Sequence, residues 1–194
     1  MSGNEWDDYA EGWDSDSFVD TYAEHAFDGL KARGDLSGLK VFDFGCGTGS
    51  LTKRMSPLAD NIVALDASSE MVRFLDQKQL ANVESHAAFL TEELLQQHPE
   101  WLGSFDRVTA SSVCSFLPDY DNTLALLKKL LKPGGLLVQW DWLAEDDATP
   151  MGFTLSRVEQ ALTDQGFSDL RVSKAFDFES PKGTLPVLMA VAKA

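Results

Sequence analysis

The sequence predicts an α/β fold: a doubly wound, mostly parallel sheet with helices on both faces. Two observations predict it. Short apolar runs alternate with segments of helical periodicity, and a glycine-rich turn follows the first of these runs. The chain has 194 residues, a size at which about 70% of the unfolded surface is buried in a single core. We expect one domain, 1–194, with a helical segment at 1–34 ahead of an α/β core at 38–194.

The N-terminal segment predicts one or two amphipathic helices. Phe18 and Tyr22 recur at helical spacing between residues 5 and 33, and Gly34 ends the pattern. Residues 1–30 carry nine Asp and Glu residues and no Lys or Arg. Two interpretations of this charge stay open: a solvated helical face, or an acidic lid that attracts a cationic substrate.

Strands and helices then alternate along the chain. Apolar runs predict strands at residues 39–44, 61–66, 83–87, 105–111 and 136–142. Helical patterns predict helices at residues 50–56, 69–79, 91–97 and 120–131, with hydroxyl caps at Ser68 and Thr91 for the second and third. Pro57 closes the first of these helices, and Pro133-Gly134-Gly135 closes the last.

The C-terminal part predicts one more helix and a strand pair. The helix covers residues 154–165, with Leu155, Val158 and Leu162 on one face. The strands cover residues 170–178 and 185–192. Only a short loop separates them, so they should pair antiparallel, because a parallel pair needs a longer crossover.

Composition and charge exclude several function classes. The formal net charge is −15, so a polyanion such as nucleic acid would be repelled. No apolar run approaches the roughly 20 residues of a membrane helix. The N-terminus has neither the basic start nor the apolar stretch of a secretory signal. Two cysteines cannot build a disulfide framework, so we expect a reducing, cytoplasmic setting.

The most informative segment is the glycine loop after the first strand. Gly45, Gly47 and Gly49 let the backbone turn sharply and approach a ligand, and the helix that follows offers amide donors. Asp66 ends the second strand, where an acid can accept hydrogen bonds from both hydroxyls of a ribose. The alternatives are a structural turn and a helix cap. Together, the loop and the acid indicate a ligand that carries a nucleoside.

The spacing of the loop argues against a dinucleotide. The fingerprint is Gly-x-Gly-x-x-Gly, whereas here the third glycine comes one residue early. Asp43 precedes the loop, where it would repel a pyrophosphate but suit a ligand with an ammonium group. A nicotinamide-dependent oxidoreductase is therefore the weaker interpretation.

Four segments together resemble the class I S-adenosylmethionine-dependent methyltransferases. They read VFDFGCGTG, VALDASSEM, FDRVTASSVCSFLPD and LKPGG, and they follow the order and spacing of the family over about residues 38–142. The resemblance is nearest to small stand-alone members that act on small molecules. It implies a Rossmann-like sheet of seven strands, with the last strand inserted antiparallel beside the fifth. It also implies S-adenosyl-L-methionine as cofactor.

The resemblance assigns the cofactor residues. Asp43 and the backbone of Gly45, Cys46, Gly47 and Gly49 would hold the methionine part, and Asp66 the ribose. Ala67 and Met71 would flank the adenine, and the carbonyl of Ser111 would face the methionine amine. The acid that the family often has after the third strand is missing here. The adenine would then be held by backbone groups and by the apolar residues Ala88, Phe89 and Leu90.

Aromatic residues at two places are candidates for an acceptor site. Tyr9 and Trp13 lie where N-terminal helices of the family cover the cofactor, and the alternative is that they anchor the helix to the core. Trp140 and Trp142 end the fifth strand and share one face of it. They could stack on a cationic or flat substrate, and core packing is the alternative. Asp141, between them, is a candidate to orient an amine or take up a proton, or a strand-end hydrogen-bonding group.

The leading hypothesis is methyl transfer to a small-molecule acceptor by in-line displacement. Family members often carry a histidine after the fourth strand, but Ser115-Phe116 stands there in this chain. The three histidines make no metal-ligand spacing. We therefore expect a metal-independent reaction driven mainly by positioning. The competing hypothesis is a non-catalytic module that binds the cofactor or a partner protein.

Overall fold

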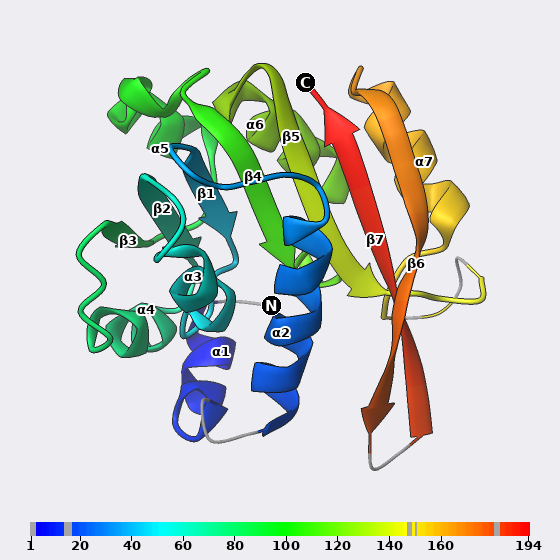
Figure 1. Ribbon diagram of the computed structural model, residues 1–194, viewed down its shortest axis with the longest axis horizontal. Coiled ribbons are helices and arrows are strands. Elements are labelled where there is room, and N and C mark those ends of the chain that lie inside the picture. Colours follow the sequence, from blue (N-terminus) through cyan, green and yellow to red (C-terminus); the bar gives the residue numbers. More distant parts are fainter. Residues whose placement is uncertain (1–2, 14–16, 147–148, 150, 181–182) are drawn as a thin grey trace.

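The computed structural model describes residues 3–13, 17–146, 149, 151–180 and 183–194. The fold is a twisted sheet of seven strands with helices on both sides (Figure 1). The strands are β1 Lys40–Phe44, β2 Asn61–Asp66, β3 Val83–Ala87, β4 Phe105–Ser111, β5 Leu131–Trp142, β6 Ser168–Ser180 and β7 Gly183–Lys193. The helices are α1 Gly3–Ala10, α2 Ser17–Lys31, α3 Ser50–Met55, α4 Ser69–Asp76, α5 Glu92–Gln97, α6 Tyr120–Leu130 and α7 Leu155–Asp164, with short 3-10 turns η2 Pro99–Trp101 and η3 Cys114–Phe116.

The strand order confirms the predicted topology. It is β3-β2-β1-β4-β5-β7-β6, and the neighbours among β1 to β5 pair in parallel. β7 runs antiparallel between β5 and β6. Because β1 to β5 are parallel, their carboxyl ends meet at one edge, the lower edge in Figure 1.

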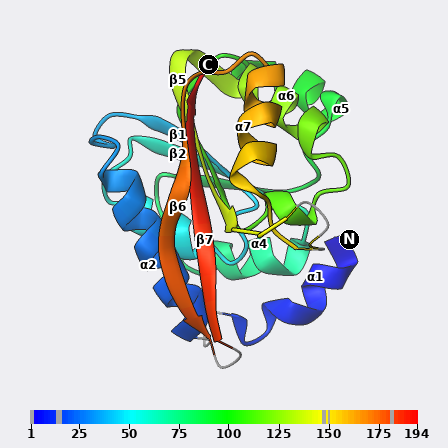
Figure 2. The same ribbon diagram turned by 90° about the vertical axis from the view of Figure 1, so that its right-hand side faces the viewer.

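Helices cover both faces of the sheet, and alternate residues of each strand face alternate layers. Val41 packs in the cluster that holds α2 and α3, whereas its neighbour Phe42 packs in the cluster that holds α5, α6 and α7. Figure 2 shows α2 on one side of the sheet and α5, α6 and α7 on the other. No helix of the described residues is long and apolar enough to cross a membrane.

Side-chain caps fix where several helices begin. The hydroxyls of Ser68 and Thr91 accept from the backbone N–H of Met71 and Leu94 at 3.1 and 3.2 Å, as predicted for these caps. Asp119 and Thr154 cap α6 and α7 in the same way. Each such cap contributes about 1 kcal/mol to helix stability.

The structure corrects the junction between α6 and β5. The helix ends at Leu130, and β5 begins at Leu131 rather than at residue 136. Leu131 has an extended backbone and pairs with Phe105, and the register then shifts so that Leu136 pairs with Arg107. Residues 132–135 form an irregular segment within β5. The Pro133-Gly134-Gly135 pattern in this segment is typical of a turn, which is why the strand was predicted to begin later.

The C-terminal hairpin is longer than predicted. β6 runs from residue 168 to 180, and its aromatic residues near the far end pack on α2. Phe178 contacts Phe18 with ring centroids 4.1 Å apart, and Phe176 contacts Tyr22 at 5.5 Å. The far end of the hairpin therefore packs on α2, a helix distant in the sequence.

Candidate functional site

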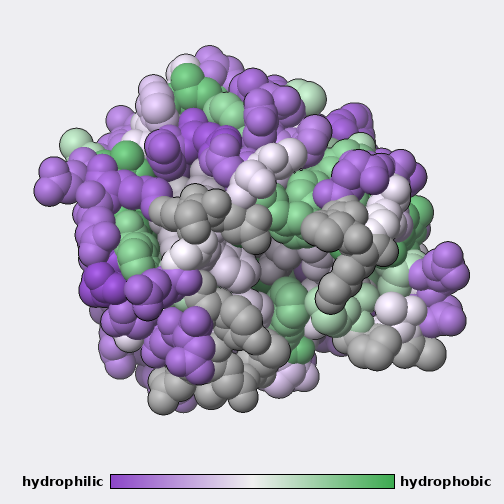
Figure 3. All heavy atoms as spheres, turned by 90° about the horizontal axis from the view of Figure 1, so that it is seen from below, coloured by the Kyte–Doolittle hydropathy of each residue, from purple (hydrophilic) through white to green (hydrophobic). Residues whose placement is uncertain are grey.

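A cavity of about 700 Å³ lies at the carboxyl ends of the parallel strands. Most of the predicted site residues line it: Trp13, Asp43, Gly45, Cys46, Gly47, Asp66, Ala67, Met71, Ala88, Phe89, Leu90, Ser111 and Trp142. Figure 3 looks onto this edge of the sheet, where hydrophobic residues reach the surface near the middle and hydrophilic residues surround them. The volume lies within the roughly 300–1,000 Å³ of small-molecule sites.

Asp43, the residue before the end of β1, lines the cavity as a buried acid. Its two carboxylate oxygens accept hydrogen bonds from the hydroxyls of Thr52 and Thr109 at 2.5 and 2.8 Å. Burial raises the pKa of Asp43 to about 6, against the lowering effect of the two hydroxyls. The two threonines come from α3 and β4, so both elements hold the carboxylate in place.

Asp66 stands at the end of β2 and organises the glycine loop. One carboxylate oxygen accepts from the N–H of Gly47 at 2.8 Å, and the other accepts from the N–H of Ser68 at 2.9 Å. Burial raises the pKa of Asp66, and these backbone donors oppose the rise. Since each carboxylate oxygen has a second lone pair, both remain able to accept a hydrogen bond from a ligand hydroxyl.

The glycine loop requires its glycines, for two different reasons. A Cβ on Gly45 would lie 2.4 Å from the Val113 side chain, so this glycine brings the loop close to the β4 end. Gly47 has a positive φ of 55° and lines the cavity. Gly49 does not line it: its left-handed backbone precedes α3, and a Cβ there would lie 2.4 Å from Leu75. The third glycine therefore serves helix packing.

The end of β3 provides an apolar wall. The N–H of Ala88 donates to the backbone carbonyl of Asp66 at 2.8 Å, which fixes the strand end next to the acid. Phe89 follows and is 56% exposed although it lines the cavity. Met71 from α4 is buried and also lines the cavity. These side chains offer flat apolar surface on the side of the cavity away from β4.

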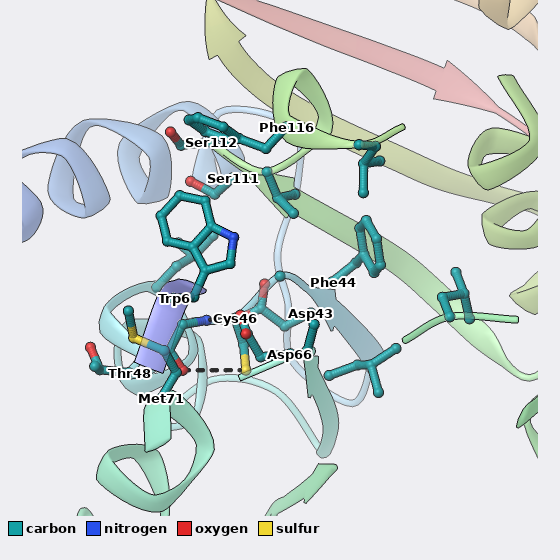
Figure 4. A pocket seen from close by; sticks show the side chains of 18 of the residues that line it. Trp6, Asp43, Phe44, Cys46, Thr48, Asp66, Met71, Ser111, Ser112 and Phe116 are labelled. Atoms are coloured by element: carbon teal, nitrogen blue, oxygen red, sulfur yellow. Dashed lines mark hydrogen bonds between the residues drawn. The ribbon is translucent and has the colours of Figure 1, made fainter. Parts of the chain in front are cut away.

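The N-terminal helix α1 covers the cavity. The indole of Trp6 lies among the lining residues, with Ser111, Ser112 and Phe116 on one side and Asp43, Asp66 and Met71 on the other (Figure 4). Its ring is edge-to-face with Phe116 at 5.1 Å and with Trp13 at 6.3 Å. The backbone of Tyr9 belongs to α1, but its side chain lies outside the described part of the structure.

Two predicted residues of the fifth strand lie in the core instead of the cavity wall. Trp140 is 0% exposed and packs so closely under α2 that a Cβ on Gly29 would lie 3.3 Å from its indole nitrogen. Asp141 is also fully buried, and it accepts from the Ser115 N–H at 3.1 Å and the Gln139 amide at 2.9 Å. Both are absent from the described cavity lining. Trp142, two residues after Trp140, does line the cavity.

Comparisons with known proteins agree with this geometry. A family of the description "Methyltransferase domain" matches residues 42–137. The ubiquinone biosynthesis O-methyltransferase of Xanthomonas oryzae pv. oryzae (strain PXO99A) is 33% identical over 133 residues, 68% of this chain and 53% of that protein. This chain belongs to the class I S-adenosylmethionine-dependent methyltransferase family. It spans about half the length of the curated relatives it matches.

Two solved structures share the methyltransferase fold with this chain. A SAM dependent methyltransferase from Aquifex aeolicus has a TM-score of 0.69 and 21% identity, covering 100% of this chain and 98% of that chain. The N-methyltransferase NodS from Bradyrhizobium japonicum WM9, in complex with S-adenosyl-L-homocysteine, has a TM-score of 0.71 and 19% identity, covering 93% and 89%.

Sequence reasoning missed one wall of this methyltransferase cavity. α2 contributes four lining residues: Phe18, Val19, Tyr22 and Ala23. The loop after β4 contributes further ones, including Ser112, Phe116, Leu117 and Asn122, and Thr48 and Trp6 were missed as well. The helical spacing of Phe18 and Tyr22 was visible in the sequence. It marks an inward face, but not whether that face meets the core or a cavity.

Proposed function

We propose that this chain transfers a methyl group from S-adenosyl-L-methionine to a small-molecule acceptor. The observation that carries the proposal is the placement of Asp43 and Asp66, which lie at the carboxyl ends of adjacent parallel strands and line one cavity with the glycine loop. A carboxylate at each position suits a ligand that carries both an ammonium group and a ribose.

The carboxylates and apolar side chains that line the cavity fit this cofactor. Asp66 would accept from the ribose hydroxyls, and Asp43 would pair with the ammonium group. The backbone of the loop at Gly45, Cys46, Gly47 and Thr48, which lines the cavity, would lie against the methionine part. Met71, Ala88, Phe89 and Leu90 would enclose the adenine through apolar contact. Among the described lining residues no Lys or Arg is present, so a pyrophosphate would find no cation, whereas a sulfonium suits the acidic lining.

The chain itself would supply alignment and exclusion of water. The sulfonium of the bound cofactor supplies an activated methyl group. An acceptor lone pair would form the bond to the methyl carbon while the carbon–sulfur bond breaks and its electron pair stays on sulfur. The acceptor proton would pass to water when the methylated product leaves the cavity. Holding acceptor and methyl group in line lowers the barrier by roughly 7–11 kcal/mol.

The acceptor would lie over the ends of β4 and β5. The cofactor residues come from β1, β2, β3 and the end of β4, so the cavity between α2, the loop after β4 and Trp142 is left for it. The name of the Xanthomonas relatives, ubiquinone biosynthesis O-methyltransferase, supports a small-molecule acceptor. The buried, unpaired thiols of Cys46 and Cys114 support a reducing, cytoplasmic setting.

A non-catalytic module is the second candidate. The observation in its favour is that Asp141, the acid expected near the acceptor, is buried outside the described lining. Such a module would bind cofactor or a partner and transfer nothing.

Two measurements test the proposal. Calorimetry with S-adenosyl-L-homocysteine should show binding to the wild-type chain and weaker binding to Asp66→Ala. Incubation with methyl-tritiated cofactor and cell extract should then label a small-molecule fraction. Binding without transfer would establish the module, and absence of binding would refute both candidates. Label in the protein or nucleic-acid fraction alone would refute the small-molecule acceptor.

A further inference from the structure

The loop after β4 forms a wall on the acceptor side of the cavity. Residues 112–119 join β4 to α6, and all of them except Cys114 and Ser115 line the cavity. Phe116 lies on the 3-10 turn η3 and meets Trp6 of α1 edge-to-face at 5.1 Å (Figure 4). A displacement of this loop would therefore change both the acceptor wall and the contact with the helix that covers the cavity.

The loop begins with a strained residue that its surroundings hold. Ser112 has a φ of 54°, in the left-handed region that a serine rarely adopts. Such a backbone persists only where neighbouring contacts fix it. The N–H of Ser112 donates to the carbonyl of Trp140 on β5 at 2.8 Å, and this bond holds the first end of the loop.

Asp141 on β5 holds the middle of the loop from inside the core. One oxygen of its fully buried carboxylate accepts from the N–H of Ser115 at 3.1 Å, and the other accepts from the side-chain amide of Gln139 at 2.9 Å. The Gln139 oxygen accepts in turn from the hydroxyl of Tyr120, the first residue of α6, at 2.7 Å. Three successive residues of β5 thus each hold one point of the chain between the end of β4 and the start of α6.

The carboxyl group of Asp141 is better explained by these donors than by packing. A buried carboxylate is unfavourable unless its hydrogen bonds are made. Burial raises the pKa of Asp141 to about 6, and the Gln139 amide and the N–H of Ser115 oppose the rise. An apolar side chain would fill the same space without this desolvation, but it would leave both donors without an acceptor.

We infer, resting on the proposed function, that Asp141 is a positioning residue for methyl transfer. It holds the loop 112–119, and with it the ring of Phe116, in the arrangement that forms the acceptor wall against Trp6. It acts through the hydrogen bonds that it accepts and not as a base for the acceptor proton, because its buried side chain is absent from the described cavity lining.

Hydrogen exchange tests the hold on the loop without any need for activity. Asp141→Ala removes the acceptor, so the amides of residues 112–119 should exchange at least about tenfold faster relative to those of β1. Asp141→Asn keeps an oxygen for the Ser115 N–H. Once the Gln139 amide rotates, the new amide also donates to it, so this variant should exchange as the wild type does.

Leu137→Ala is the matched control for exchange. Leu137 is buried in the same strand and is absent from the described lining, so its truncation lowers the stability of the whole domain without touching the loop. Unchanged loop exchange in Asp141→Ala, or the same loop-specific rise in Leu137→Ala, would overturn the inference.

The labelled-methyl assay tests the effect on the reaction. At saturating cofactor, Asp141→Ala should transfer label into the small-molecule fraction of cell extract at least about tenfold more slowly, because the acceptor is misaligned. Its affinity for S-adenosyl-L-homocysteine should change by less than about threefold. Asp141→Asn should restore most of the rate, whereas a loss as large as that of Asp141→Ala would assign a proton-accepting role and overturn the inference. A wild-type chain that transfers nothing would instead reject the proposed function, and loop exchange alone would then decide whether Asp141 holds the loop.

A second variant breaks the same hydrogen bond from the loop side, so the test stands even if Asp141→Ala does not fold. Ser115→Pro has no N–H to donate to Asp141, and position 115 lies in the single turn of η3. It should show the same faster loop exchange and slower transfer. Ser115→Ala keeps the N–H and is its control, with a much smaller change in both measurements. Equal effects of the two variants would show that the N–H bond to Asp141 does not hold the loop.

Discussion

The carboxylate of Asp7 in α1 accepts a hydrogen bond from the hydroxyl of Ser68 at 2.5 Å, and the same Ser68 oxygen caps α4 by accepting from the N–H of Met71. The same Asp7 oxygen also lies 3.3 Å from the N–H of Glu70. Since Ser68 follows Asp66 by two residues, this contact ties the N-terminal helix to the strand end that carries the proposed ribose site. It joins the cover of the cavity to one of its walls.

Removal of the Asp7 carboxylate should loosen helix α1 from its place over the cavity. Hydrogen bonds to charged groups are worth about 1.5–3 kcal/mol, so Asp7→Ala should raise amide exchange throughout α1 and weaken cofactor binding, with global stability little changed. Hydrogen exchange with and without S-adenosyl-L-homocysteine measures this. Asp8→Ala, the exposed neighbour, is the control. Equal exchange in α1 of both variants would show that the contact does not hold the helix.

Asp66→Ala should weaken cofactor binding by at least about tenfold. The variant loses the acceptor for the ribose hydroxyls, and it also releases the N–H groups of Gly47 and Ser68 that hold the loop. Calorimetry with S-adenosyl-L-homocysteine measures the change. Asp60→Ala removes the same charge from an exposed position before β2 and should bind as the wild type does. Unchanged affinity in Asp66→Ala would remove this acid from the site.

The features that could be predicted from sequence are local in the chain. The first strand, the glycine loop and α3 are contiguous, and Asp66 closes the very next strand, so periodicity and spacing bring them together without knowledge of the tertiary structure. Strand order beyond these units came from the family resemblance, which supplied the inserted position of β7.

The features that could not be predicted depend on where distant elements end. Trp140 and Trp142 share one face of β5, and period-2 alternation cannot separate them. α2 passes over Trp140 at Gly29, whereas Tyr22 and Phe18, about two and three turns earlier in the helix, line the cavity with Trp142. The axial position of α2 along the sheet decides which tryptophan is core, and no local signal encodes that position.

The two tryptophans should therefore respond differently to truncation. Trp140→Ala removes a fully buried ring and should lower the free energy of unfolding by about 3–5 kcal/mol. Trp142→Ala should cost less and should weaken acceptor binding, with S-adenosyl-L-homocysteine affinity retained. Urea unfolding and calorimetry on the same preparations separate the effects. A larger loss of stability in Trp142→Ala than in Trp140→Ala would contradict the assignment of core and wall.

Methyl transfer should continue in the presence of a chelator. The sulfonium is already a good leaving group, so alignment of the acceptor leaves no step that needs a Lewis acid. The labelled-methyl assay, run with and without EDTA after the protein has been dialysed against it, measures this. Turnover that EDTA abolishes and a divalent cation restores would require a metal in the reaction.

Cofactor affinity should depend on pH near 6 because of Asp43, whose burial raises its pKa to about that value. The carboxylate is the form that pairs with the ammonium group, so affinity should be full above about pH 7 and should fall by up to about tenfold per pH unit below 6.

The effect of Asp43 on folding has the opposite sign. The native state holds the Asp43 proton more tightly than the unfolded chain, in which the pKa is 3.8. This contribution to stability is therefore present at low pH and lost as pH rises through about 6. Calorimetry and unfolding measured from pH 5 to 8 separate the two trends. Asp43→Asn, which cannot ionise, should bind weakly and flatten both profiles, and a wild-type affinity that stays constant over this range would show that the ionised Asp43 does not pair with the cofactor.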